Sequence, residues 1–295
     1  MHRSLFINQP SCCSNQGVTC GNVSGTANYA SVLSIDLSAL RLSGSLPSEI
    51  GYFSSITSFV IGSNSIFGTI PSTIGNMTSL LYLDIGFNSI SGTVPSSIGA
   101  LTSLQVALMN LNRIVGTLPP SIGSLKMLTV ISFDTNFLSG GLPSTVQDMT
   151  ALKLLTLYNN RLSGTIPASL SALRKLDALY LDRNSLTGTI PSSLGTITGL
   201  KSLVLSYNFL TGTIPNTFSA LTILDSLLLQ SNYLTMGSLS TVPPSTFSQF
   251  TRDRALDISL NCLVYKSPNN PSQSTNATRC RCKITYIFFV PTNMI

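Results

Sequence analysis

Charged side chains are scarce in this 295-residue chain, which has 16 Lys and Arg, 10 Asp and Glu and a single histidine. That histidine is His2, so a Ser/His/Asp or Cys/His arrangement has no base in the rest of the chain. The cysteines have neither the C-x-x-C spacing nor the histidine partners of a zinc site. Phosphate-binding and kinase signatures are missing as well. We therefore predict no enzymatic activity, no cofactor and no metal.

Long hydrophobic runs are also missing, although 43% of the residues are hydrophobic. No run reaches about 18 residues, and Ile284–Val290 is too short to cross a bilayer, so we expect no membrane span in this chain. The net charge is +6, yet residues 32–251 hold nine basic and eight acidic side chains. The basic excess lies in residues 252–283 rather than along one face, which argues against a nucleic-acid partner.

An apolar pattern restarts at a fixed interval along the chain. Each unit reads approximately L-x-x-L-x-L-x-x-N-x-L-x-G-x-I-P-x-x-I-G-x-L, and a tenth unit begins at Asp253 after a longer interval. The other nine units begin at Val32, Ile56, Leu80, Leu104, Leu128, Leu152, Leu176, Leu200 and Leu224. A constant period in the range of about 20 to 29 residues, with fixed Leu and Asn places, is the signature of a repeat solenoid.

Each position of the unit, counted from its first residue, has a structural reason for its residue type. Apolar residues at positions 1, 4 and 6 predict a short strand with one face buried. Asparagine at position 9 can satisfy backbone groups where the chain leaves the strand, which predicts a ladder of stacked amides. That ladder comprises Asn64, Asn88, Asn112, Asn136, Asn160, Asn184, Asn208, Asn232 and Asn261.

Glycine at position 13 and proline at position 16 shape the rest of the unit. Glycine permits a positive φ or a close backbone approach, and proline fixes φ and removes a donor. We therefore expect extended chain and at most a short 3₁₀ turn on the convex side, ended by the frequent glycine at position 20.

The pattern resembles the plant-type leucine-rich repeat, as in LYLDRNSLTGTIPSSLG (Leu179–Gly195) and LTLYNNRLSGTIPASLS (Leu155–Ser171). The resemblance covers about four fifths of the chain. It implies a repeat solenoid of about ten 24-residue leucine-rich repeats, a curved right-handed coil with a concave parallel β-sheet. It also implies an extracellular recognition ectodomain, as in receptor-like proteins and receptor kinases, and the repeat number is similar to that of secreted polygalacturonase inhibitors.

The cysteines cluster at the two ends of the chain. The stretch CCSNQGVTC (Cys12–Cys20) resembles the family's N-terminal cap, although Asn15 stands in place of its tryptophan. The resemblance implies the disulfides Cys13–Cys20 and Cys262–Cys280. It leaves Cys12 and Cys282 unpaired, because the partners that the family pattern requires are missing. We therefore expect a truncated N-terminal cap in residues 1–31, a solenoid in 32–263, a C-terminal cap in 264–283 and a tail in 284–295 that is disordered or a gene-model artefact.

Three glycosylation sequons agree with an extracellular or cell-surface location, although the first residues lack the apolar core of a signal peptide. They begin at Asn22, Asn76 and Asn276.

Exposed positions 3, 5, 7 and 8 are predicted to form columns on the concave face. Most hold small or polar residues, whereas units six to eight gather aromatic and charged side chains of the kind enriched in binding hot spots. The candidate ligand-binding residues are Tyr158, Asn159, Tyr180, Asp182, Arg183 and Tyr207. A weaker patch comprises Tyr82, Asp84 and Phe87, and the irregular stretch Met236–Pro244 in the ninth unit is expected to form a loop.

Three functions remain open from the sequence. The first is the ligand-binding ectodomain of a receptor-like protein that holds a peptide, glycan or protein partner, with a possible co-receptor. The second is a secreted inhibitor of a cell-wall hydrolase. The third is a structural or adhesive wall protein without a specific ligand.

Overall fold

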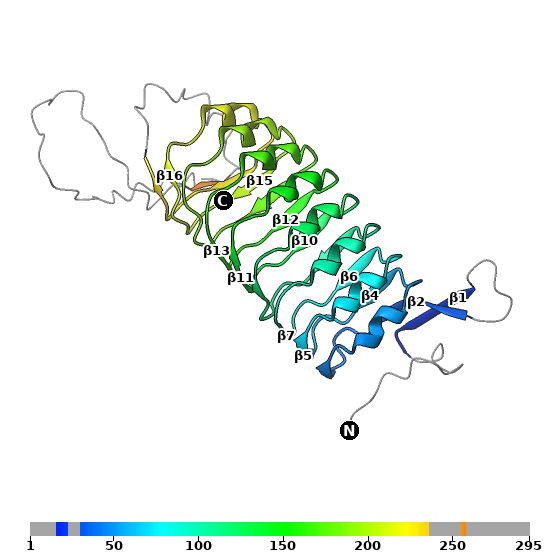
Figure 1. Cartoon of the computed structure of the whole chain (residues 1–295). Helices are drawn as coiled ribbons and strands as arrows, with labels where there is room; N and C mark the ends of the chain where they lie inside the picture. Colours follow the sequence, from blue (N-terminus) through cyan, green and yellow to red (C-terminus); the bar gives the residue numbers. More distant parts are fainter. Residues whose placement is uncertain (1–15, 23–29, 236–254, 258–295) are drawn as a thin grey trace, which may run out of the picture.

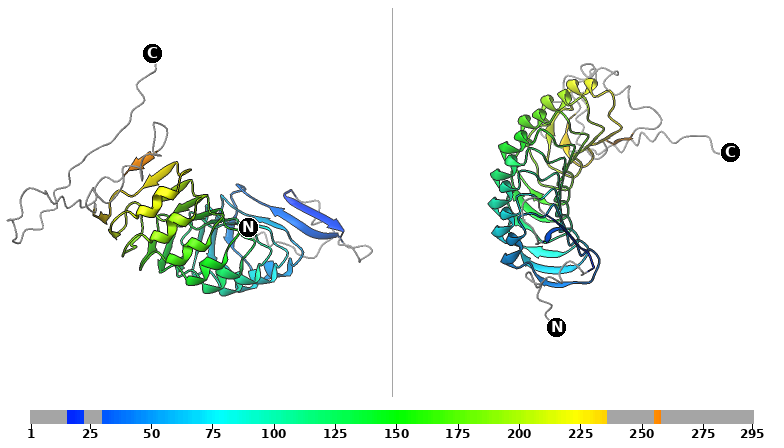
Figure 2. Two further views of the ribbon diagram at one scale, coloured as in Figure 1. Left: turned by 90° about the horizontal axis from the view of Figure 1, so that it is seen from above. Right: turned by 90° about the vertical axis from the view of Figure 1, so that its right-hand side faces the viewer.

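The computed structural model describes residues 16–22, 30–235 and 255–257, which form one curved coil of stacked units (Figure 1). Seen along the arc, the strands lie on the inner side and a row of short helices lies on the outer side (Figure 2). Every described helix is a 3₁₀ helix. The predicted fold class, a leucine-rich-repeat solenoid with a concave parallel sheet and a 3₁₀ convex side, is therefore confirmed.

The concave side is a single sheet of eleven strands. Consecutive strands are parallel and pair equivalent positions of neighbouring units, as in Ser58 with Tyr82, because each unit repeats the same backbone path. Only β1 runs antiparallel, against β2, and so closes the N-terminal edge of the sheet. In spatial order the strands are β1 (Val18–Asn22), β2 (Ala30–Asp36), β4 (Ser58–Val60), β6 (Tyr82–Asp84), β8 (Val106–Leu108), β10 (Val130–Ser132), β12 (Leu154–Thr156), β14 (Ala178–Tyr180), β15 (Ser202–Val204), β17 (Ser226–Leu228) and β19 (Ala255–Asp257).

Short strands at positions 10 to 14 form a second, lateral set of parallel pairings. The glycine at position 13 has a positive φ in each of the first eight units, as in Gly92 at 72°, where side chains other than glycine are strained. The lateral strands are β3 (Ser43–Ser45), β5 (Ser65–Thr69) and β7 (Ser89–Ser91) in one sheet, β9 (Val115–Gly116), β11 (Phe137–Gly140) and β13 (Arg161–Leu162) in another, and the pair β16 (Thr211–Gly212) and β18 (Tyr233–Leu234).

A short 3₁₀ helix follows the proline of each of the first eight units on the convex side. The proline is the extended residue just before the helix, with φ near −67° and ψ near 139° at Pro119. The expectation that the glycine at position 20 ends the turn is wrong. That glycine lies inside the helix, and a methyl group at Gly123 would be 2.3 Å from the Thr145 carbonyl oxygen of the next turn. The helices are η2 (Ser48–Tyr52), η3 (Ser72–Asn76), η4 (Ser96–Ala100), η5 (Pro120–Ser124), η6 (Ser144–Asp148), η7 (Ala168–Ala172), η8 (Ser192–Thr196) and η9 (Asn216–Ala220).

The core is a continuous apolar column inside the coil. The units contribute side chains from the same seven positions, and the buried ones form one continuous cluster along the stack. In the third unit these residues are Leu80, Leu83, Ile85, Ile90, Val94, Ile98 and Leu101, all 4% exposed or less. Burial of each leucine or isoleucine contributes about 1.5 to 3 kcal/mol, and stacking is what buries them.

Candidate ligand-binding face

The concave face is made of three columns of side chains, at positions 3, 5 and 7 of the stacked units. They point away from the core because strand residues alternate between the two faces of a sheet. On β10 and β12, for example, Ile131 and Leu155 are 2% exposed in the core, and the neighbouring positions 3 and 5 face the concave side. The columns are therefore fixed in register by the core.

The asparagine at position 9 holds the edge of this sheet where the chain turns outward. Asn184 Nδ2 donates to the carbonyl oxygens of Leu157, Leu181 and Asp182 at 3.0, 3.1 and 3.2 Å. Its Oδ1 accepts the Leu162 amide at 2.9 Å. The same bonds recur in the other units of the stack, so the amides form a ladder from Asn64 to Asn232, and Asn261 lies outside the described residues.

Three of the six candidate residues lie on the concave columns and three at the edge of the sheet. Tyr158, Tyr180 and Asp182 occupy positions 7, 5 and 7 of neighbouring strands, and all are partly buried. The other three occupy position 8, where φ is positive and the chain leaves the strand. They are Asn159, Arg183 and Tyr207, with φ of 54°, 54° and 55°.

Burial and like charge perturb the ionisable groups of the concave columns. Burial raises the pKa of the Tyr158 hydroxyl, and the negative charge of Asp134 raises it further. Burial likewise raises the pKa of the Asp182 carboxyl. In the weaker patch, burial raises the pKa of Tyr82 and of Asp84, although the Gly86 amide donates to Asp84 Oδ1 at 2.9 Å and opposes the shift at Asp84. Phe87, the third residue of this patch, is 54% exposed at position 8.

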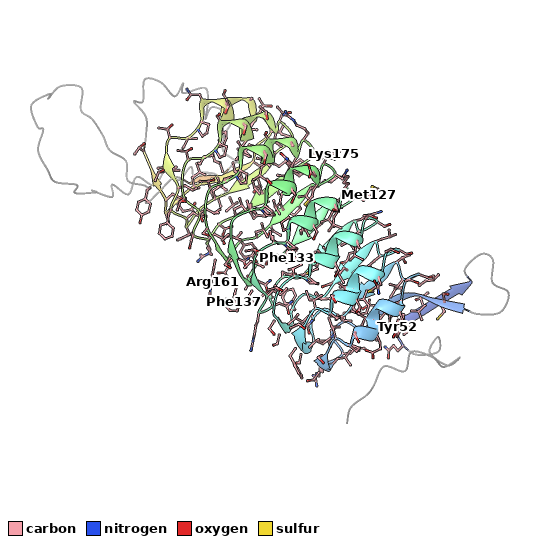
Figure 3. The ribbon with its side chains drawn as sticks, viewed as in Figure 1. Tyr52, Met127, Phe133, Phe137, Arg161 and Lys175 are labelled. Atoms are coloured by element: carbon pink, nitrogen blue, oxygen red, sulfur yellow. The ribbon has the colours of Figure 1, made fainter. Side chains whose placement is uncertain are left out.

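The edge of the sheet carries exposed aromatic rings that contact arginine. The Arg183 guanidinium lies 4.6 Å from the centre of the Tyr207 ring, and that of Arg161 lies 4.7 Å from the Phe137 ring. Figure 3 shows Arg161 beside Phe137 at the edge away from the 3₁₀ helices, while Phe133 lies inside the coil. Cation–π contacts of this kind hold both side chains in place.

The sequence interpretation missed a further column of large side chains, which lies at position 10, at the edge of the sheet. Phe137 and Arg161 belong to it, and so do Phe209 and Tyr233, whose rings stack 6.0 Å apart. Its signal was the recurrence of large side chains one place after the asparagine. A pocket of about 260 Å³ opens at this edge and joins candidate residue Asn159 to the column; it is lined by Asn112, Thr135, Asn136, Phe137, Asn159, Asn160 and Arg161.

A larger shallow groove of about 800 Å³ lies on the lateral side of units six to eight. Threonine and proline from positions 14 and 16 line it, including Thr165, Pro167 and Thr189. None of the candidate residues reaches this groove, so it is separate from the predicted binding face.

Most of the predicted cap features lie outside the described residues. Cys20 is disulfide-bonded, but its predicted partner Cys13 is not described, so the pairing stays a prediction. The same holds for Cys12, Cys262, Cys280 and Cys282, for Asn276 and for Met236–Pro244. Asn76 is exposed at the end of η3 on the convex side. Among the described residues, no helix combines the length and hydrophobicity needed to span a bilayer.

The comparisons with known proteins agree with this architecture. A protein-family model described as leucine rich repeat matches residues 126–186 and 174–234, and a second leucine-rich-repeat family model matches residues 79–101. The plant peptide hormone receptor RGFR1, solved in complex with RGF2, is 36% identical with a TM-score of 0.63, over 80% of this chain and 41% of that one. The Arabidopsis receptor kinase HAESA, solved with the peptide hormone IDA and the co-receptor SERK1, is 30% identical with a TM-score of 0.67, over 75% and 36%.

A third plant structure extends this group. The leucine-rich-repeat ectodomain of Arabidopsis GASSHO1/SCHENGEN3, in complex with CASPARIAN STRIP INTEGRITY FACTOR 2, is 31% identical with a TM-score of 0.59, over 75% of this chain and 32% of that one. The chain thus spans between a third and two fifths of the length of these structures. No curated protein matches it.

Fold and concave columns together define a leucine-rich-repeat solenoid. The chain belongs to the plant-type leucine-rich-repeat family and is similar to plant receptor ectodomains solved with peptide hormones.

Proposed function

We propose that this chain is part of the extracellular ectodomain of a plant-type receptor-like protein and that its concave face binds a peptide or protein partner. The observation that carries the proposal is the gathering of Tyr158, Tyr180 and Asp182 in two neighbouring units of the concave face. Tyrosine offers a flat apolar ring with a polar tip, which suits contact with another chain.

Other features support an extracellular location and a peptide partner. Cys20 is disulfide-bonded, and disulfides persist mainly outside the cytosol. The sequon at Asn76 lies on the convex side, so a glycan there would leave the concave face free. The similar structures were solved with bound peptide hormones, one of them also with a co-receptor, and they support a peptide as the partner and a co-receptor as a further one.

Alanine substitution of the tyrosines tests the proposal. A peptide would be selected on the wild-type protein from a displayed random library, and its affinity would then be measured by biolayer interferometry. Tyr158→Ala and Tyr180→Ala should each weaken binding by about tenfold or more, because hot-spot aromatics dominate contact energies. Tyr207→Ala tests whether the edge of the sheet takes part.

The matched control is Tyr52→Ala, since Tyr52 is 75% exposed on the convex helix η2. Its affinity should equal that of the wild type. Equal binding by Tyr158→Ala, Tyr180→Ala and the wild type would refute the concave face as the binding surface.

A further inference from the structure

The concave columns carry charge of one sign. Positions 3, 5 and 7 of the first nine units hold four carboxylates and no lysine or arginine, although the whole chain has a net charge of +6. The carboxylates are those of Asp36, Asp84, Asp134 and Asp182. A ligand on this face therefore meets a negative surface on a basic protein.

Neither of the two central carboxylates, Asp134 and Asp182, forms a salt bridge among the described residues. Asp134 is 4% exposed, and its Oδ1 accepts a hydrogen bond from Ser132 Oγ at 2.5 Å. Asp182 is partly buried and lies two units away from Asp134, and Tyr158 occupies the equivalent position of the unit between them. Arg183, the nearest base in sequence, lies over the Tyr207 ring and forms no salt bridge with Asp182, although its positive charge opposes the rise that burial causes in the pKa of that carboxyl. By contrast, Asp177 at the strand entrance pairs with Lys201 at 3.3 Å.

A buried hydroxyl in the same place also lacks a partner. Thr156 is 7% exposed, and its Oγ1 makes no hydrogen bond. It lies at position 5 of β12, in register with Ser132 on one side and Tyr180 on the other, and so faces the concave side. Buried polar groups are nearly always satisfied, so each exception needs an explanation. A ligand that brings polar groups to this face supplies one.

We propose that the concave face recognises an extended peptide through a basic side chain, lysine or arginine, that lies over Tyr158 between Asp134 and Asp182. This inference rests on the proposed function and names the chemistry of its ligand. A cation there gains the attraction of two carboxylates in a partly buried setting, where charges interact more strongly than in water. The Tyr158 ring adds a cation–π contact, and the Thr156 hydroxyl completes the polar floor.

Sequencing the peptides selected from the random library tests this chemistry. The wild type should enrich lysine or arginine at one position. Replacing that residue by citrulline, which keeps the shape of arginine without its charge, should weaken binding by about tenfold or more. Asp134→Asn and Asp182→Asn should each remove most of this discrimination while retaining the circular dichroism spectrum of the fold. Asp148→Asn, on the exposed convex helix η6, is the matched control and should change nothing.

The outcomes separate the two proposals. Peptides that need Tyr158 and Tyr180 but show no preference for basic residues would overturn the charge inference and leave the proposed function standing. Failure to select any peptide that depends on the tyrosines would instead refute the proposed function. Spermidine that binds as tightly as the selected peptides and displaces them would identify a free polyamine as the ligand and overturn the peptide assignment.

Discussion

At the scale of single residues, the asparagine of position 9 shows how one side chain joins two units. Its amide nitrogen donates within its own unit and to the preceding one, and its oxygen accepts an amide from the preceding unit. Alanine at this position would leave a buried N–H of the preceding unit unpaired and would take one of two donors from each of three carbonyls. The cost therefore includes groups in a neighbouring unit as well as the lost bonds.

Asn184→Ala is expected to lower the free energy of unfolding by about 1 to 3 kcal/mol, because the Leu162 N–H loses its acceptor in the interior, while the Leu157 carbonyl keeps Asn160 Nδ2 as a second donor. Urea unfolding followed by circular dichroism measures the change. Asn216→Ala makes the same chemical change at an exposed site in η9 and should stay within about 0.5 kcal/mol of the wild type. Equal destabilisation by the two variants would show that the ladder bonds add nothing.

The residue scale is also where prediction from sequence was least complete. The alternation of apolar and exposed positions along each strand placed Tyr158, Tyr180 and Asp182 on one face, because the apolar positions of a strand fix its register. It did not reveal that position 8 takes a positive φ, which places Asn159, Arg183 and Tyr207 at the edge of the sheet. Nor could it show that the Thr156 hydroxyl is unpartnered, since that depends on the geometry of three strands at once.

At the scale of the element, the sequence pattern of the convex turn predicted the 3₁₀ helix correctly but the role of its position-20 glycine wrongly. Proline and the short 3₁₀ helix follow from backbone chemistry that a single unit contains. The glycine at position 20 looked like a helix end, yet the contact that requires it comes from the next unit. Stacking of turns, rather than capping, therefore selects glycine there.

Gly123→Ala tests that explanation. The new methyl group would meet the Thr145 carbonyl oxygen at 2.3 Å, so the turns must separate, and stability should fall by about 1 to 3 kcal/mol. Gly199→Ala is the control, because its methyl group would have no neighbour closer than 3.9 Å and needs no positive φ. It should be neutral or raise stability by up to about 1 kcal/mol. Thermal unfolding of both variants measures the difference, and a similar loss from each would contradict a role for close stacking.

At the scale of the whole molecule, the constant period predicted the coil almost completely. Every concave strand from β2 to β17 pairs with the equivalent strand of the next unit, so the period alone determined the sheet, the core column and the concave face. The sign of the charge on that face follows from the same period. The repeats are nearly neutral in total, but the positions that the period assigns to the concave face hold four carboxylates and no basic side chain in the first nine units.

The same period makes a final prediction about the coil as a stack of interchangeable units. Deleting residues 105–128 joins Leu104 to Thr129 in register, so β6 meets β10 as it now meets β8, and the asparagine ladder stays continuous. The shortened protein should keep its circular dichroism spectrum, and its urea m-value should fall by about a tenth, because m follows the surface exposed on unfolding. Loss of cooperative unfolding by this shortened protein would show that the fold depends on particular units rather than on the stacking of equivalent ones.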